Sequence, residues 1–172
     1  IESPTLLECS VSRLVPDPRV STARSNVGDA QFVVAFEGTQ IWVNSGFDDA
    51  VSEYGAATGA VRDSITGGDA PLGVAFDGTH IWVTNSDDGT VSKIVAATGV
   101  FAATITVGDA PFGVAFDGTH IWATNAFDDT VSKIVAATGA VTDTITVGDA
   151  PSGVAFDGPH IGAPNNTDGT VA

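Results

Sequence analysis

The order of apolar and polar residues predicts four short strands within a stretch of 40 residues. The first strand is apolar, and Asp77-Gly78 directly after it is a strong signal for a hairpin turn of type I′, in which both central residues have positive φ. Clusters of Asp, Thr and Gly separate the strands that follow. The four expected strands are 73–76, 80–85, 90–95 and 101–107. Because every connection is short, they are expected to form an antiparallel meander.

Both faces of the first two expected strands are apolar. Ile81 and Val83 alternate with Trp82 along the second strand, so neither face of the sheet is suited to contact with water. A sheet of this kind has to be covered on both sides. In the fourth strand, apolar residues alternate with Thr and Ala, which is typical of a partly exposed strand. Burial is therefore expected to fall from the first strand to the last, as it does along the radius of a β-propeller blade.

The four-strand pattern is an internal repeat with a period of 40 residues. The units 68–107 and 108–147 are identical at 31 of 40 positions, and 28–67 is a more divergent copy. A fixed period of this length is typical of propellers and other repeat architectures. A parallel β-helix would need shorter coils, and a β-sandwich would not repeat so faithfully.

Each end of the chain carries half of a further unit. Residues 148–172 begin a fourth copy and supply its first half. Residues 11–15 lie 80 positions, two whole repeats, before 91–95 and match them in character, so residues 1–27 supply the second half. We therefore expect one all-β domain over 1–172. This domain is a β-propeller with three complete blades and a fourth blade split between the termini, or part of a larger ring.

The second strand of the repeat carries a motif found in a known family. Ile81-Trp82-Val83-Thr84-Asn85, preceded by Gly-Asp-Ala-Pro at 68–71 and Val-Ala-Phe-Asp-Gly at 74–78, resembles the YVTN class of β-propeller repeat, with Trp in place of Tyr. The resemblance covers nearly the whole chain and is specific for the fold. It implies a bacterial or archaeal secreted or surface-layer propeller that is extracellular, at the cell surface or periplasmic. More distant relatives include propeller lyases and quinoprotein subunits.

The chain departs from that family in two respects. Family propellers usually have about seven blades, so a closed four-blade ring, a fragment of a longer protein and a homodimer that completes a larger ring all stay open. The last unit is also altered, because Gly162 stands where Trp82 and Trp122 stand and because Pro159 and Pro164 replace Thr. Proline cannot donate to a β-ladder. The second strand of the last unit is therefore expected to be weak.

The formal charge of −15 is carried by the repeats. Residues 1–27 hold three acidic and three basic residues, which leaves 18 acidic against three basic residues beyond them. Such a surface repels phosphate backbones, so nucleic acid is not expected as a partner, and it suits solvation, cations or a basic partner. No apolar run approaches a membrane span, so no membrane insertion is expected. The single cysteine, Cys9, excludes an internal disulfide framework.

One Trp and one His recur in the second strand of the units. The tryptophans are Trp42, Trp82 and Trp122. They could stack sugars, as in a lectin, but Trp between Ile and Val in mid-strand is more often core between blades. The histidines are His80, His120 and His160, with Gln40 in the first copy. They could form a ring of ligands, but a zinc ion needs its ligands within about 2.1 Å, which favours a structural or solvent-exposed role.

Aspartates recur at the entry to the first strand of each unit. They are Asp29, Asp69, Asp109 and Asp149. In a closed ring they would gather near one mouth of the channel, where their carboxylates could hold Ca²⁺. The alternative that we favour is that they accept hydrogen bonds from backbone amides in the turn before the next strand. Acidic pairs between the second and third strands, such as Asp87-Asp88, lack the spacing of a calcium loop and are expected to be solvated.

No set of residues predicts a catalytic mechanism. The polar residues found in only one unit are Arg13, Arg19, Arg24, Glu53, Tyr54 and Arg62. They show no Ser-His-Asp order, paired-carboxylate signature or glycine-rich phosphate loop. The sequence favours a non-enzymatic module, without a cofactor, that presents a loop face to a protein or glycan. The alternatives are a fragment of a lyase or quinoprotein-like enzyme whose catalytic residues lie in other blades, and a cation-dependent lectin.

Overall fold

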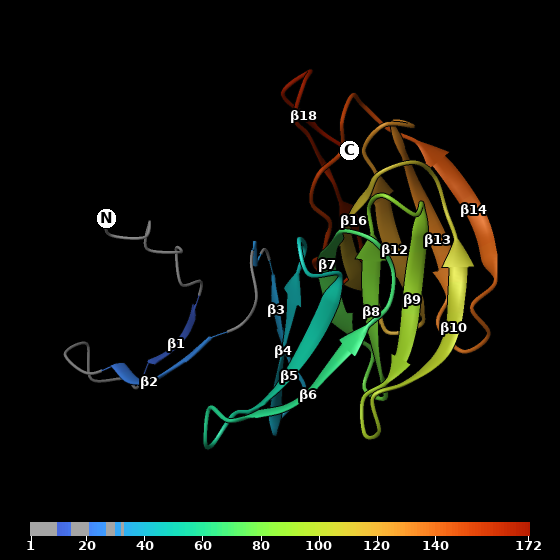
Figure 1. Ribbon diagram of the computed structural model, residues 1–172. Coiled ribbons are helices and arrows are strands. Elements are labelled where there is room, and N and C mark those ends of the chain that lie inside the picture. The colour runs from blue at the N-terminus through green and yellow to red at the C-terminus, as the bar shows by residue number, and fades with distance from the viewer. Residues whose placement is uncertain (1–9, 15–20, 27–29, 32) are drawn as a thin grey trace.

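The structure, a computed structural model, describes residues 10–14, 21–26, 30–31 and 33–172. All regular elements in this part of the chain are β-strands, and none of it forms a helix long and apolar enough to cross a membrane. Three antiparallel sheets of four consecutive strands lie side by side in an arc (Figure 1). The all-β fold and the four-strand meander are thereby confirmed.

We call the three sheets blades one, two and three. Blade one consists of β3 (Val34–Phe36), β4 (Gln40–Ser45), β5 (Ala50–Gly55) and β6 (Val61–Thr66). Blade two consists of β7 (Pro71–Phe76), β8 (His80–Asn85), β9 (Thr90–Val95) and β10 (Val100–Thr106). Blade three consists of β11 (Pro111–Phe116), β12 (His120–Asn125), β13 (Thr130–Val135) and β14 (Val141–Thr146).

Shorter strands flank the three blades. The N-terminal hairpin consists of β1 (Ser10–Leu14) and β2 (Ser21–Asn26). The C-terminal half-blade consists of β15 (Ala155–Phe156), β16 (Ile161–Gly162), β17 (Pro164–Asn165) and β18 (Thr170–Val171).

The turn after the first strand of blade two differs from the prediction. Of Asp77 and Gly78, only Gly78 has a positive φ, at 99°, so the expected type I′ turn is not formed. The turn closes with a hydrogen bond from the Asp77 amide to the His80 carbonyl at 3.1 Å. The Asp77 carboxylate accepts hydrogen bonds from the amides of Thr79 and His80 at 2.8 and 2.7 Å. The aspartate therefore stabilises the turn through its side chain, as Asp and Asn commonly do.

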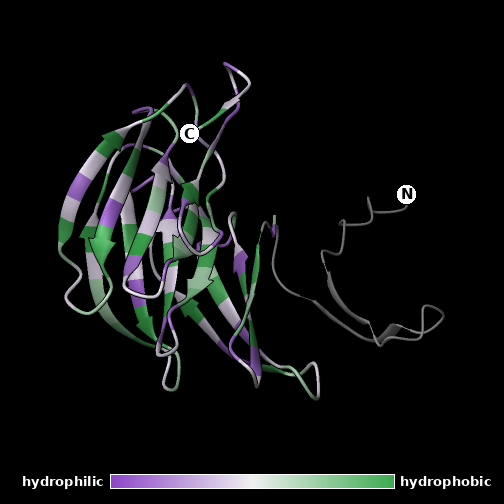
Figure 2. Ribbon diagram, turned by 180° about the vertical axis from the view of Figure 1, so that it is seen from behind, coloured by the Kyte–Doolittle hydropathy of each residue, from purple (hydrophilic) through white to green (hydrophobic). Residues whose placement is uncertain are grey.

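Each blade packs against the next through its second strand. Trp42 of blade one is buried in a cluster with Ile81 and Val83 of blade two. Trp82 of blade two is buried in turn with Ile121 and other residues of blade three. The predicted fall in burial from the first strand to the last is found only in part: β10 is mostly exposed, as expected, but β8 is more buried than the first strand, β7. Figure 2 shows hydrophobic positions concentrated in the stacked strands.

Glycines allow the inner strands of neighbouring blades to approach closely. A Cβ atom at Gly73 would overlap the carbonyl oxygen of Phe112 in blade three, and one at Gly113 would lie 2.9 Å from the Ser152 carbonyl oxygen. Thr84 links the same strands, because its hydroxyl accepts the Gly73 amide at 2.8 Å and donates to the Phe112 carbonyl at 2.7 Å. Backbone contact and side-chain bridge together set the spacing of the blades.

The N-terminal hairpin has the register of the two outer strands of a blade. Leu14 pairs with Ser21, and the equivalent residue 80 positions on, Ile94, pairs with Phe101. A register irregularity occurs at the same place in both hairpins. This agreement supports the prediction that the N-terminal residues form the second half of a unit.

The C-terminal half-blade is interrupted where the sequence predicts a weak strand. The strand expected at 160–165 is divided into β16 and β17, with Ala163 between them. Pro164 cannot donate to the ladder, and it has no hydroxyl to bridge the inner strands as Thr84 does. The predicted weakness is confirmed.

The described parts of the N-terminal hairpin and the half-blade belong to separate sheets. Figure 1 shows them at opposite ends of the arc. The junction of the split blade, expected between 11–27 and 148–167, is therefore not made within this structure. The division of 1–172 into blades 28–67, 68–107 and 108–147 plus one split blade stays a prediction. Residues 1–9, 15–20, 27–29 and 32 lie outside the described residues.

Gly73→Ala is expected to lower the free energy of unfolding by about 1–3 kcal/mol, because the added methyl group overlaps the backbone of blade three. Gly153→Ala is the matched control. Gly153 has the same place in the half-blade, but its Cβ would meet nothing closer than 3.5 Å. Urea unfolding of both variants measures the difference, and equal losses would contradict the close approach of the inner strands.

Candidate functional site

A hydrogen-bond network recurs where the first strand of a blade turns into the second. In blade two, the Asp77 carboxylate accepts a hydrogen bond from Nε1 of Trp82 at 2.8 Å and lies 3.3 Å from Nδ1 of His80. Blade three repeats the same distances around Asp117. His and Trp reach one carboxylate because residues two apart point to the same face of a strand.

Burial or contact with the neighbouring Asp gives most of the repeated Trp and His residues a structural role. Trp42 and Trp82 are 0% exposed, so neither offers a ring face to a sugar, and the interpretation as core is confirmed for these two. Trp122 is only partly buried. His80 and His120 each contact the Asp three residues earlier in their own blade, which agrees with the favoured structural role. His160 is largely exposed beside Asp157.

Hydrogen bonding strongly favours the ionised form of the network carboxylates. Burial alone would raise the pKa of Asp117, but hydrogen bonds from the His120 amide, the Trp122 indole and the Thr119 amide outweigh it and lower the pKa to about 2. For Asp77, burial is likewise outweighed by the equivalent donors, and its pKa is lowered. Both carboxylates therefore stabilise the fold as anions.

Blade one has lost this network. Glu37 stands in place of Asp, and its carboxylate accepts a hydrogen bond from the Thr39 hydroxyl at 2.6 Å rather than from the indole. Nε1 of Trp42 is buried without a hydrogen-bond partner. An unsatisfied buried donor costs about 1–3 kcal/mol. Blade one is therefore weakened at this point.

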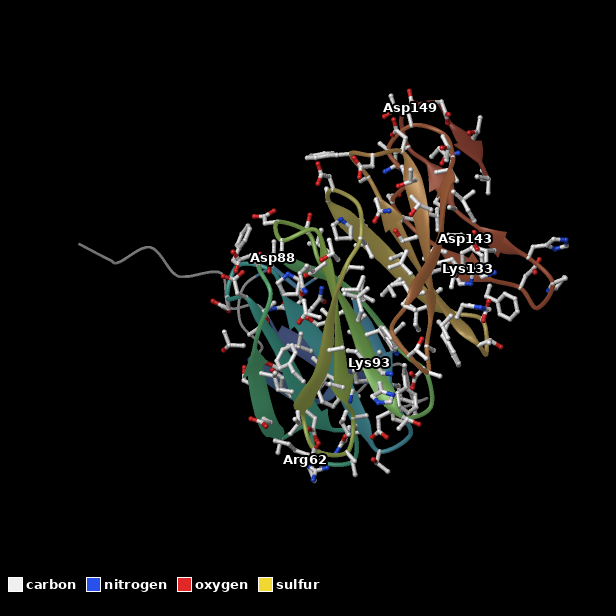
Figure 3. The ribbon with its side chains drawn as sticks, turned by 90° about the vertical axis from the view of Figure 1, so that its right-hand side faces the viewer. Arg62, Asp88, Lys93, Lys133, Asp143 and Asp149 are labelled. Carbon is white, nitrogen blue, oxygen red and sulfur yellow. The ribbon has the colours of Figure 1, made fainter. Side chains whose placement is uncertain are left out.

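The loops at the other end of the blades carry ten aspartates and neither Lys nor Arg. They come from the turns between the second and third strands and from the connections between blades. We call them the aspartate face: Asp48, Asp49, Asp69, Asp87, Asp88, Asp109, Asp128, Asp129, Asp149 and Asp168. Figure 3 shows Asp88 and Asp149 at one end of the strands and Arg62 at the other.

Some of these carboxylates tie the loops together. Asp88 accepts the backbone amide of Asp69 at 2.8 Å, and blade three repeats this bond. Asp49 accepts the amide of Ala70 at 3.0 Å and so links blade one to the connection into blade two. The sequence predicts that Asp69 and its equivalents bind backbone amides and that the Asp88 group is solvated. In the structure these roles are reversed, because the Asp88 carboxylate accepts the hydrogen bond from the Asp69 amide. The two residues lie in different loops, 19 positions apart in the sequence, which the folded sheet brings together.

The aspartate face has no preformed metal site in the part of the chain that the structure describes. No group of three or more His, Cys, Asp or Glu residues there could hold a metal ion. Asp69, Asp109 and Asp149 lie in successive connections between blades, so the convergence required for Ca²⁺ is not found for them. Asp29 lies outside the described residues.

Three of the six polar residues found in only one unit lie on the outer strands of blade one. Glu53 and Arg62, on neighbouring outer strands of blade one, form an ion pair at 3.4 Å. Burial raises the pKa of Glu53 against the opposing effect of Arg62. Tyr54 is buried beside them in β5. The remaining three are Arg13 in β1, Arg24 in β2 and Arg19, which lies outside the described residues.

No family model matches the chain, and no curated protein matches its sequence. Solved structures match its fold. Hydrazine synthase of Kuenenia stuttgartiensis superimposes with a TM-score of 0.74 at 20% identity, over 81% of this chain and 43% of that one. The WD40 β-propeller domain of Doa1 gives 0.69 at 18% identity, over 83% and 48%. The computationally designed protein Ika4 gives 0.75 at 18% identity, over 84% and 89%.

These similarities show a β-propeller-like repeat fold. The chain spans less than half the length of hydrazine synthase and of the Doa1 domain. At such low identity the likeness concerns the fold alone, and one fold can host many unrelated functions. The function has to be argued from the surface of this chain.

Glu37→Asp is expected to raise the free energy of unfolding by about 1 kcal/mol, because a shorter carboxylate can accept the indole N–H of Trp42 as Asp77 accepts that of Trp82. The reciprocal variant, Asp77→Glu, should destabilise blade two. Urea unfolding measures both changes. If Glu37→Asp leaves stability unchanged or lowers it, the unpaired N–H is not the weakness of blade one.

Acid is expected to destabilise the protein between about pH 4 and pH 2 in part through Asp117. Its pKa of about 2 in the folded chain lies below the ordinary 3.8, so its contribution is complete above pH 3.8 and is lost as the pH falls through 2. The shift corresponds to on the order of 2 kcal/mol. Urea unfolding at stepped pH should show a smaller acid loss for Asp117→Asn than for the parent. Parallel pH curves would show that Asp117 does not contribute.

Proposed function

We propose that the protein is a non-enzymatic binding module whose aspartate face takes a basic partner, a protein surface or segment rich in Lys and Arg. The observation that carries the proposal is the composition of that face, with ten carboxylates and no cationic side chain in its loops. An extracellular or cell-surface location belongs to the proposal and is supported by the resemblance to the YVTN repeat.

The negative charges on this face repel one another. The pKa of Asp69 is raised, chiefly by the charge of Asp88, then by that of Asp49 and by burial. A raised pKa means that the ionised loops gain from any nearby positive charge. A basic partner relieves this repulsion, and complementary charge also speeds association and selects the partner.

Two exposed aromatic residues project from the same loops. Phe47 is 80% exposed and Phe127 is 83% exposed, and each directly precedes an Asp of the aspartate face. Aromatic residues are enriched at protein interfaces, and their rings attract Arg and Lys. The pair therefore favours a protein partner over a glycan. Of the three tryptophans on which the lectin alternative depends, Trp42 and Trp82 are inaccessible and Trp122 is partly buried.

The double variant Asp69→Asn, Asp109→Asn is expected to weaken binding of a short peptide rich in Arg and Lys by roughly 3–10-fold, because two charges leave the binding face. Fluorescence anisotropy at about 0.1 M salt, where the Debye length is about 10 Å, measures the dissociation constant.

The matched control is Asp63→Asn, Asp143→Asn, which removes the same charge from exposed sites on the outer strands β6 and β14. Its effect should be clearly smaller. Equal weakening by the two double variants would mean that the peptide responds only to net charge. That result would contradict binding at the aspartate face.

A further inference from the structure

A cavity of about 510 Å³ lies between blade three and the C-terminal half-blade. Its walls include Trp122, Val131 and Ile145 of blade three and Phe156 and Ile161 of the half-blade. These side chains are mostly apolar, as in the packed contacts between the complete blades. The cavity therefore lies where a complete fourth blade would pack.

The contact between blades two and three shows which strands of a next blade are missing beside blade three. Ile105 of blade two is 7% exposed and lies in a cluster with Ile134 and Ala136, in and directly after the third strand of blade three. Ile145, the residue equivalent to Ile105 one unit later, is 43% exposed. Trp122 is likewise only partly buried. The missing cover is therefore the outer strand pair of the next blade.

The surroundings of two equivalent lysines also indicate that the outer strand pair of the next blade is missing beside blade three. Lys93 and Lys133 each place Nζ 5.1 Å from the ring centre of the Trp in their own blade. Lys93 also donates a hydrogen bond to the carbonyl of Ala136 in the next blade at 2.7 Å. Within 33–172, no carbonyl accepts an equivalent hydrogen bond from Nζ of Lys133. The Lys133 side chain is also more exposed than that of Lys93. Figure 3 shows both lysines.

The outer strand pair that fits is present in the chain as the N-terminal hairpin. By the 40-residue period, Leu14 has the position of Ile134, and Pro16 that of Ala136. The hairpin is already paired in blade register. β18 pairs with β17, and Ala172 exchanges backbone hydrogen bonds with Ala163, so residues 170–172 already occupy the first part of the third-strand position. Only the outer edge of β16, at Ile161 and Gly162, is open, and the strand that fits there is the end of β1 at Leu14.

The hairpin of the same chain is not suited to fill the cavity. It lies at the far end of the arc (Figure 1), and closure by it would make a ring of four blades. In such a ring the rotation from one blade to the next about the ring axis is twice that in an eight-blade ring. The chain superimposes on propeller structures of which it covers only 43% and 48%. In both cases its blades superimpose on part of a longer chain, which agrees with an open arc that belongs to a larger ring.

We propose that two copies of this chain close one eight-blade ring, in which the N-terminal hairpin of each copy fills the cavity of the other. Six blades each belong to a single copy, and two are composite. Leu14 of one copy pairs with Ile161 of the other, as Ile134 pairs with Ile121 within blade three. The inserted hairpin covers Ile145 and supplies the carbonyl for Lys133. This assembly does not depend on the partner of the aspartate face.

Light scattering of the full chain is expected to give twice 17.3 kDa. Ile145→Asp should reduce the mass to that of one chain with the β-sheet circular dichroism retained, because the new charge is tolerated at an exposed site but not beneath a hairpin. Val141→Asp is the matched control on the same strand. Val141 is 40% exposed, and its equivalents Phe101 and Val61 are exposed within complete blades, so no hairpin covers it. A parent mass of 17.3 kDa, or the same response of both variants, would overturn the proposal.

Disulfide trapping identifies the copy that supplies the hairpin. In a Cys9→Ser background, one tagged chain carries Leu14→Cys and a second, differently tagged chain carries Ile161→Cys. Oxidation of the mixture is expected to join the two tags, because directly opposed residues on antiparallel strands lie within disulfide reach. Arg13→Cys in place of Leu14→Cys is the control, because successive positions of a strand face opposite sides of a sheet. No link between the tags, or an equal link with the Arg13→Cys control, would overturn the proposal.

Discussion

Every blade of this protein depends on having both faces of its sheet covered. In β8, Ile81 and Val83 point to one side and Trp82 to the other, and all three are 0% exposed. Blade one covers the first side and blade three covers the second. Neither cover can be replaced by water, because the hydrophobic effect opposes exposing such residues. A blade is therefore stable only as a member of a row, and the ends of the row are where the structure is incomplete.

The two ends of each blade use acidic residues in opposite ways. At one end, Asp77 and Asp117 are enclosed by donors and belong to the packing of the blade. At the other end, some carboxylates bind backbone amides while many remain exposed and repel one another. The first arrangement stabilises the fold at neutral pH. The second accumulates charge that only solvent, salt or another molecule can compensate, and for this reason it carries the functional proposal.

Sequence periodicity predicts most of the fold but little of the environment of individual residues. The limits of β8 and β9, the outer-strand character of the N-terminal hairpin and the break at Pro164 all follow from the period and from the chemistry of proline. The contact of Asp88 with Asp69 does not, because it joins loops that only the folded sheet brings together. Ile105 and Ile145 lie in the same local sequence, yet differ in exposure because their neighbours differ.

The near identity of the units 68–107 and 108–147 has an evolutionary consequence. Most residues of the surface that blade two offers to blade three recur in blade three, although Asp143 stands in place of Ala103. A tandem duplication of one unit would therefore join two surfaces that largely fit already. The array can therefore grow or shrink by unequal recombination without any new interface having to arise. Selection for a given ring size then acts on the terminal halves, where Gly162 and Pro164 already show divergence.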